Sequence, residues 1–244
     1  MADVRAQNLT KRYCLGETDF WALQEVSFFL PDHSFTVIVG ESGCGKTTLL
    51  RLLGGLEAAT AGTIQLSGQV AEVSQEKVGL VFQEPRLMPW LTVRQNMAFP
   101  LVKRLGKNLI TARVNHYLQK LGLERFAESL PRQLSGGMAQ RVALGRTLCY
   151  DPDIILLDEP FGALDYFTRQ RLQQDMVELF LEQPKTIVFV THDVAEAVTL
   201  GQKILVMAQG KIKAEIAVPL PYQRDPREMA FFAKQNEVLE ALQG

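Results

Sequence analysis

The stretch GESGCGKTT at residues 40–48 places three glycines, a lysine and two threonines within nine residues. It matches the pattern G-x-x-x-x-G-K-[ST] through Gly40, Gly45, Lys46 and Thr47. An apolar run, FTVIV, precedes it, and a segment with apolar residues at helical spacing, TTLLRLLGGL, follows it. Glycines let a backbone wrap an anion without Cβ clashes, and the amide groups at a helix start point at that anion. The pattern therefore predicts a strand, a phosphate-binding loop and a helix, in preference to an ordinary glycine turn.

The charged and hydroxyl side chains of this loop suit a nucleotide that carries several phosphates and Mg²⁺. Lys46 supplies a point charge for the β- and γ-phosphates, and the Thr47 hydroxyl can ligate the metal. The residues expected to contact the nucleotide here are Gly40, Glu41, Ser42, Gly43, Cys44, Gly45, Lys46, Thr47 and Thr48.

A second motif, IILLDEP, supplies the carboxylate that a phosphate-bound metal needs. The apolar run predicts a buried strand that ends at Asp158, which we expect to hold Mg²⁺. Glu159 follows, and its carboxylate can orient or deprotonate a water molecule. Two acidic residues at a strand end can also simply cap a helix or face solvent, but the phosphate loop in the same chain favours the catalytic interpretation.

The overall composition describes a globular chain without a strong charge. Its 244 residues are 47% hydrophobic, enough to bury a sizeable core, and 26 basic residues oppose 27 acidic ones. A net charge of -1 gives no general attraction for nucleic acid or anionic lipid. Cys14, Cys44 and Cys149 lie far apart, which argues against zinc sites and disulfides and favours a reducing compartment. No run reaches the ~18 apolar residues of a membrane span and the N-terminus lacks a signal peptide, so any membrane role requires a partner.

The hydrophobic periodicity along the chain predicts alternating strands and helices. Near-continuously apolar runs at 153–158 and 185–191 suit central parallel strands, covered by helices at 166–182 and 193–200. Between residues 84 and 150 the pattern changes to amphipathic helices with no strand. Further elements are expected as strands at 26–30, 35–39, 62–66 and 78–82, a hairpin about Gln209 and Gly210 within 203–216, and a helix at 227–242.

A third motif, LSGGMAQR at 134–141, predicts a second helix start suited to an anion. Ser135 can serve as the N-cap, with Gly136 and Gly137 in the first turn. With these motifs in this order, the sequence resembles the ATP-binding subunits of ABC transporters over nearly its whole length. Met138 stands where the signature loop of that family, LSGGQ, has glutamine. Because Ser135 and the glycine amides would face the phosphates, we expect function to survive this difference.

The resemblance implies roles for four further residues. Tyr13 would stack on the adenine of ATP, and Gln83 in VFQE would reach Mg²⁺ and the attacking water as the glutamine of the Q-loop. Asp165 in FGALD would communicate across a dimer, and His192 in FVTHD would contact the γ-phosphate as the switch histidine. Each also has a plainer interpretation: an edge-strand aromatic, a polar strand end, a helix N-cap and a structural histidine, respectively.

The resemblance also implies an assembly. The signature loop of one protomer would cover the ATP held by the phosphate loop of a second copy, in a head-to-tail dimer, so hydrolysis would need both chains. A helix of a membrane permease would dock beside Gln83, where the apolar cluster LMPWL at 87–91 could instead anchor the helical subdomain. The runs PRLMPWLTVRQN and FGALD are similar to import ATPases of the nitrate, sulfonate and taurine type. That similarity implies a peripheral position on the cytoplasmic face of the membrane and a solute-binding protein in the complete system.

Together these patterns predict the fold class α/β, with a P-loop NTPase core, a mixed, largely parallel central sheet and an N-terminal antiparallel β subdomain. Residues 1–83 and 151–244 would form the nucleotide-binding core and residues 84–150 an inserted α-helical subdomain, within a single domain of residues 1–244. The predicted activity is ATP hydrolysis that drives solute import. The alternative is a soluble ABC-type ATPase acting on nucleic acid or ribosomes, but such proteins usually carry a long coiled-coil insertion or two cassettes, and this chain has neither. A small-molecule kinase would leave LSGGM and VTHD without a role.

Overall fold

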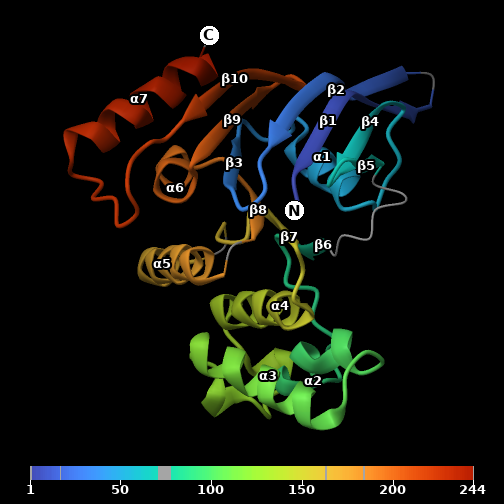
Figure 1. Ribbon diagram of the computed structural model, residues 1–244, viewed down its shortest axis with the longest axis vertical. Helices are drawn as coiled ribbons and strands as arrows, with labels where there is room; N and C mark the ends of the chain where they lie inside the picture. The colour runs from blue at the N-terminus through green and yellow to red at the C-terminus, as the bar shows by residue number, and fades with distance from the viewer. Residues whose placement is uncertain (1, 17, 71–77, 163, 184, 244) are drawn as a thin grey trace.

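The computed structural model describes residues 2–16, 18–70, 78–162, 164–183 and 185–243 (Figure 1). At the centre of this described part lies a six-stranded sheet, whose strands run parallel except that β10 pairs antiparallel with β9. The predicted mixed, largely parallel sheet is therefore confirmed. In spatial order the strands are β10 (Lys211–Ala217), β9 (Lys203–Ala208), β3 (Phe35–Val39), β8 (Thr186–Thr191), β7 (Ile154–Asp158) and β6 (Val78–Val81).

The central strands are apolar on both faces because both faces are covered. Every residue of β3, β7 and β8 is buried. Alternate side chains of one strand enter different hydrophobic cores: Val37 and Val39 belong to one, whereas Ile38 belongs to the other. The runs FTVIV, IILLD and TIVFVT therefore lack the alternation that a half-exposed strand would show.

An antiparallel sheet is built from the N-terminal part of the chain (Figure 1). Helix α1 (Lys46–Leu53) shares a core with it, since Leu49 packs with Leu9 of that sheet and with Ile38 of the central sheet. The predicted N-terminal antiparallel β subdomain is confirmed. Its described strands, in spatial order, are β2 (Thr18–Leu30), β1 (Val4–Leu15), β4 (Ala61–Leu66) and β5 (Gln69–Val70).

The stretch from residue 84 to residue 150 contains helices and no strand, as predicted. Figure 1 shows α2, α3 and α4 gathered at the end of the molecule away from the antiparallel sheet. None of the described helices combines the length and the hydropathy that a membrane span requires. The remaining described helices are α2 (Val93–Ala98), α3 (Lys107–Lys120), α4 (Gly136–Tyr150), α5 (Tyr166–Glu182), α6 (Val194–Leu200) and α7 (Met229–Gln243), with 3-10 turns at Phe99–Leu101, Glu124–Phe126 and Pro131–Gln133.

Candidate functional site

The phosphate loop joins β3 to α1 and requires glycine where other backbone segments approach it. A Cβ on Gly40 would stand 2.2 Å from the carbonyl oxygen of Met207, and one on Gly45 would stand 2.3 Å from that of Ala22. Gly43 and Gly45 also have left-handed backbones, with φ of 82° and 106°. Gly45 is the N-cap of α1 and makes no side-chain cap to the first amides, which leaves them for an anion.

Lys46 is buried under this loop, with 4% of its side chain exposed. Its Nζ donates to the carbonyl oxygens of Gly40 and Glu41 at 2.7 and 2.8 Å. Glu159 Oε1 lies 3.9 Å from the same nitrogen. The backbone of the loop thus holds the lysine charge at the place where phosphate oxygens would arrive.

Thr47 and Asp158 come together although they lie on different elements, α1 and β7. The Thr47 hydroxyl donates to Asp158 Oδ1 at 3.0 Å. Asp158 is 7% exposed, and its burial raises the pKa of the carboxyl above the usual range, against the opposing effect of the Thr47 hydrogen bond. Two oxygen ligands, one of them a carboxylate, therefore stand side by side under the phosphate loop.

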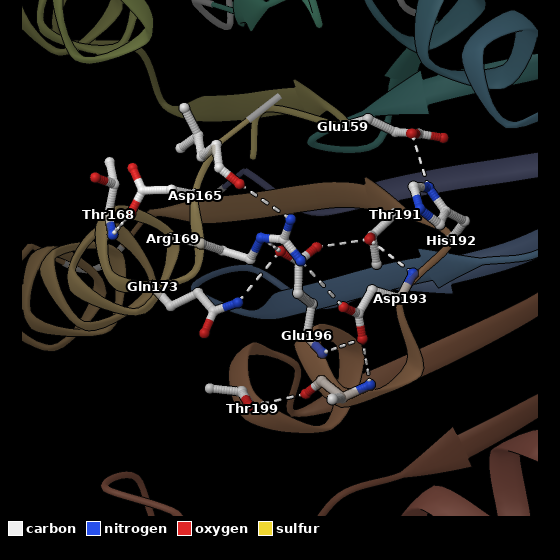
Figure 2. A network of polar contacts seen from close by, with 12 residues as sticks. Glu159, Asp165, Thr168, Arg169, Gln173, Thr191, His192, Asp193, Glu196 and Thr199 are labelled. Carbon is white, nitrogen blue, oxygen red and sulfur yellow. Dashed lines mark hydrogen bonds and ion pairs between the residues drawn. The ribbon is translucent and has the colours of Figure 1, made fainter. Parts of the chain in front are cut away.

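Glu159 occupies the centre of the site in a strained conformation. Its φ is 42°, an unfavourable value for a residue with a side chain, and its N–H donates to the carbonyl of Val190 at 3.0 Å. Its Oε2 lies 2.9 Å from Nδ1 of His192, whose side chain is 59% exposed (Figure 2). The Glu159 carboxylate is thus placed between Lys46 on one side and His192 on the other.

These residues meet because parallel strands end at the same edge of a sheet. The phosphate loop follows β3, Asp158 ends β7, and His192 follows β8. Gln83 follows β6 and also reaches this edge: a Cβ on Gly162 would lie 3.9 Å from both Gln83 Nε2 and Glu159 Oε2. The four predicted motifs with catalytic residues therefore converge in one protomer.

The signature loop and Asp165 lie together at a different place. Ser135 is the N-cap of α4 and its Oγ accepts from the N–H of Met138 at 3.3 Å, as the sequence predicts for an N-cap. Asp165 is the N-cap of α5 and accepts from the N–H of Thr168 at 3.0 Å. A Cβ on Gly137 would stand 3.0 Å from a Thr168 methyl group, so the two helix starts touch. Among the described residues, no hydrogen bond or ion pair joins residues 135–137 to the phosphate loop.

Tyr13 lies on strand β1 alongside α1, near Thr48 in the first turn of that helix and Glu57 just beyond its end. Its hydroxyl donates to Glu57 Oε2, and Nζ of Lys11 sits 5.0 Å from the centre of its ring. Burial and the Glu57 carboxylate raise the pKa of the Tyr13 hydroxyl. In the antiparallel ladder Tyr13 stands opposite Phe20, which is 48% exposed, so the adenine platform stays a prediction beside the edge-strand interpretation.

Two residues of α4 that the sequence analysis did not single out fasten the segment around Gln83. Gln140 Nε2 donates to the carbonyl of Phe82 at 3.0 Å. The guanidinium of Arg146 donates to the carbonyls of Pro85 and Arg86 at 3.1 and 2.9 Å. Helix α4, which starts at the signature loop, is therefore hydrogen-bonded to the backbone on either side of Gln83. No local pattern in AQRVALGR marks these contacts, because their partners lie on a distant segment.

A comparison with known protein families identifies the family to which a chain with this site belongs. The family described as ABC transporter matches residues 23–162, which include the phosphate loop, Gln83, the signature loop and Glu159. The chain belongs to the ABC transporter family. Two relatives of this ABC protein support the assignment, and the second of them covers the whole chain, including the Tyr13 and His192 regions outside the matched residues. They are an aliphatic sulfonates import ATP-binding protein of Bacillus cereus, 40% identical over 89% of this chain and 87% of the relative, and a taurine import ATP-binding protein of Jannaschia, 40% identical over 100% and 94%.

The fold of this ABC protein also matches a solved structure. A dimeric ATP-binding cassette in a post-hydrolysis state, bound to ADP and phosphate, aligns with a TM-score of 0.82 at 34% identity. The alignment covers 89% of this chain and 100% of the other. The P-loop NTPase core predicted from the sequence is therefore confirmed.

The thiol of Cys44 gives a first test of the loop geometry. Cys44 is 7% exposed and burial raises its pKa, so little thiolate is present at neutral pH. We expect N-ethylmaleimide to label the exposed Cys14 at least ~10-fold faster than Cys44. Nucleotide slows the labelling of Cys44 further, because the residues around it would hold phosphate. Time-resolved peptide mass mapping measures both rates; equal labelling of Cys44 with and without nucleotide would contradict its place in a binding loop.

Proposed function

We propose that this chain is the ATP-binding and ATP-hydrolysing subunit of an ABC import transporter, in which ATP closes a dimer and drives solute uptake through a membrane permease. The observation that supports this most is the convergence of Lys46, Asp158, Glu159 and His192 at one edge of the parallel sheet. The importer names of the two relatives support the same function. Neither the charge of the chain nor these relatives favours the nucleic-acid alternative.

In this proposal the phosphate loop amides and Lys46 bind the β- and γ-phosphates. Thr47 and Asp158, whose oxygens are 3.0 Å apart, suit Mg²⁺, which takes one or two protein oxygens and completes its shell with phosphate and water. Such an ion would neutralise part of the phosphate charge. Among the described residues no cluster of three or more His, Cys, Asp or Glu suggests a transition metal.

Glu159 acts on the attacking water, orienting it and accepting its proton. The hydrogen bond from His192 holds the Glu159 carboxylate in place, and the imidazole would contact the γ-phosphate of bound ATP. Gln83 contributes to the positions of metal and water. The strained backbone of Glu159 coincides with a carboxylate that lies 3.9 Å from Lys46 Nζ, which fits a conformation kept for function.

The site needs a second copy of the chain to be complete. Residues 135–137 make no polar contact with the phosphate loop of their own protomer among the described residues, which suits a role on the nucleotide of the partner. Asp165 lies against this loop and would meet the same partner. The dimeric cassette with ADP and phosphate supports this arrangement. After hydrolysis, loss of the γ-phosphate contacts would loosen the interface.

The permease would dock on the segment after Gln83. This segment exposes an aromatic side chain, and its backbone is held by hydrogen bonds to a buried side chain. Trp90 is 72% exposed, while the Asn96 side chain, fully buried, bonds the backbone of Met88 and Leu91. Arg146 ties the start of this segment to α4, so movement at Gln83 and movement of the helical subdomain at 84–150 would be linked. The protein would thus sit peripherally on the cytoplasmic face of the membrane.

The relatives also narrow the solute class. Their names are those of importers of aliphatic sulfonates and of taurine, so we propose a small sulfonated compound as the solute; nitrate, which the loop resemblance also implies, has no support from these names. A separate solute-binding protein would deliver it to the permease. Uptake of radiolabelled taurine or alkanesulfonate by cells with and without the gene for this chain tests the class.

The dimer itself is tested by size-exclusion chromatography with light scattering. We expect a monomer in the absence of nucleotide and a dimer with Mg²⁺ and a non-hydrolysable ATP analogue. Ser135→Arg places a bulky side chain in the signature loop, which would cover the nucleotide of the partner, so we expect this variant to bind the analogue and stay monomeric. Thr111→Arg, at an exposed position of α3, dimerises normally. A wild-type protein saturated with the analogue but still monomeric contradicts the proposal.

Met138 tests how the signature loop works. Its backbone N–H bonds to Ser135 and its side chain packs partly against the core, so the side chain is not needed for the phosphate contact. We expect Met138→Gln to change kcat for ATP hydrolysis by less than about twofold. A gain of tenfold or more in a phosphate-release assay would show that the glutamine usual in the family acts directly.

A further inference from the structure

A network of polar contacts surrounds the turn that bears His192, and several of its members, among them Arg169, Asp193 and Glu196, have no role in the function proposed above (Figure 2). Its only cation among the residues drawn in Figure 2, apart from the histidine itself, is Arg169, in the first turn of α5. One guanidinium nitrogen of Arg169, Nη2, donates to the carbonyl of Leu164 at 3.2 Å. Arg169 is therefore attached to the turn formed by Leu164 and Asp165, next to the signature loop.

The other side of the guanidinium faces α6. Arg169 Nη1 lies 3.6 Å from Asp193 Oδ2, and Nε lies 3.9 Å from Glu196 Oε1. Asp193 is the N-cap of α6, and its Oδ1 accepts from the N–H groups of Ala195 and Glu196 at 2.8 and 3.2 Å. Arg169 thus spans from the start of α5 to the start of α6.

Of the two neighbours of His192 in the chain, Thr191 bonds to a carboxylate that faces Arg169, and Asp193 itself carries the other such carboxylate. Thr191 donates its hydroxyl to Glu196 Oε2 at 2.6 Å, and the same hydroxyl accepts from the N–H of Asp193 at 3.0 Å. The Glu196 side chain is only 7% exposed, so its position depends on the charge and the hydrogen bonds around it. The backbone on each side of His192 is therefore tied, through one residue, to Arg169.

The link to Arg169 is not fully tightened. Both distances to the carboxylates exceed those of good hydrogen bonds, and Nε of Arg169 is buried without a hydrogen-bond partner. A shift of the guanidinium by under about 1 Å toward Glu196 would satisfy this donor, and a buried donor without a partner is unfavourable. The contacts between Arg169 and the two carboxylates are therefore expected to shorten when the turn at Leu164 and Asp165 is pushed.

We propose that Arg169 is a positioning residue that couples the turn at Leu164 and Asp165 to His192, and through His192 to Glu159. The inference rests on the proposed function, in which that turn meets the partner protomer and Glu159 acts on the attacking water. Contact with the partner tightens the link from Arg169 to Asp193 and Glu196. The His192 ring is then held in the geometry that orients the Glu159 carboxylate, so cleavage is favoured only in the closed dimer.

A double-mutant cycle tests this coupling by steady-state phosphate release at varied ATP concentration. Arg169→Met keeps the apolar length of the side chain and removes its charge and donors. We expect it to lower kcat about tenfold and to leave the KM for ATP within about twofold, because Arg169 does not touch the nucleotide. On a His192→Ala background the same substitution lowers kcat by less than about twofold, since no imidazole remains to be positioned. Arg171→Met, at an exposed position on the same helix, leaves kcat within about twofold on both backgrounds.

Arg169→Lys provides the second variant. A lysine keeps the charge but lacks the fork that reaches both the Leu164 carbonyl and the carboxylates, so it restores only part of the loss. If Arg169→Met lowers kcat by the same factor with and without His192, Arg169 is merely structural and the inference is overturned; the Arg169→Lys cycle decides the case if the methionine variant does not fold. A wild-type protein that neither dimerises on ATP nor hydrolyses it would instead overturn the proposed function.

Discussion

Glu159→Gln lowers kcat for ATP hydrolysis by about 10²–10⁴-fold, while the affinity for ATP stays within about threefold. The amide cannot accept the proton of the attacking water, but it has the shape of the carboxylate and can still bond His192, which lies 2.9 Å from Oε2. Lys46 and the loop amides that bind phosphate are unchanged. Phosphate release measures kcat, and calorimetry measures the dissociation constant.

The same variant should accumulate as a dimer with ordinary ATP, because hydrolysis no longer opens the interface. Glu237→Gln, on the exposed side of α7, is the matched control and hydrolyses ATP at the wild-type rate. If Glu159→Gln also turned over at that rate, Glu159 would not act on the water, and its strained backbone would need another explanation.

Lys46→Ala lowers the affinity for ATP by about 10²-fold. A hydrogen bond to a charged partner contributes about 1.5–3 kcal/mol, and Lys46 has only 4% of its side chain exposed, so solvent does not replace the lost interaction fully. Lys46→Arg should not restore binding, because the planar guanidinium is larger than the ammonium that fits between the carbonyls of Gly40 and Glu41. Calorimetry with the ATP analogue gives the dissociation constants.

Folding must be followed separately for the Lys46 variant. Removing Nζ takes a donor from the carbonyls of Gly40 and Glu41, of which Glu41 keeps the N–H of Cys44 at 3.3 Å, so we expect the thermal midpoint of the nucleotide-free protein to fall. Lys211→Ala, an exposed lysine on β10, changes neither the midpoint nor the affinity. Unchanged ATP affinity in a folded Lys46→Ala protein would exclude a role for this lysine in phosphate binding.

Most of the central sheet could be predicted from local patterns. The expected helix at 166–182 coincides with α5, and α1 ends before Gly54 because glycine there favours a helix end. The antiparallel sheet is harder to predict: of its first two strands the pattern indicates only VSFFL at 26–30, whereas β1 and β2 extend over Val4–Leu15 and Thr18–Leu30. Much of β1 is polar, and it is a strand because pairing with β2 and β4 satisfies its backbone, which no local pattern reveals.

Individual site residues were likewise visible one motif at a time. Gly40, Gly45 and Lys46 belong to one short loop, so the local sequence is enough to predict them. The Ser135 and Asp165 N-caps bond within their own helices, which is also a local feature. The contacts between motifs were not visible. Arg169 is an unremarkable helix residue in sequence, and only the packing of α5 beside α6 brings it to Asp193 and Glu196.

Short segments of this chain thus dictate their own backbone and the chemical groups they present, because strand, loop and helix starts depend on neighbours a few residues away. Which groups face one another was decided by the order of β3, β8, β7 and β6 in the sheet, since parallel strands place their carboxyl ends at one edge. Glu159 reaches both His192 and Lys46 only because these residues follow neighbouring strands that end at that edge. Long-range strand order is set by burial of whole faces, a property of the folded chain and not of any stretch within it.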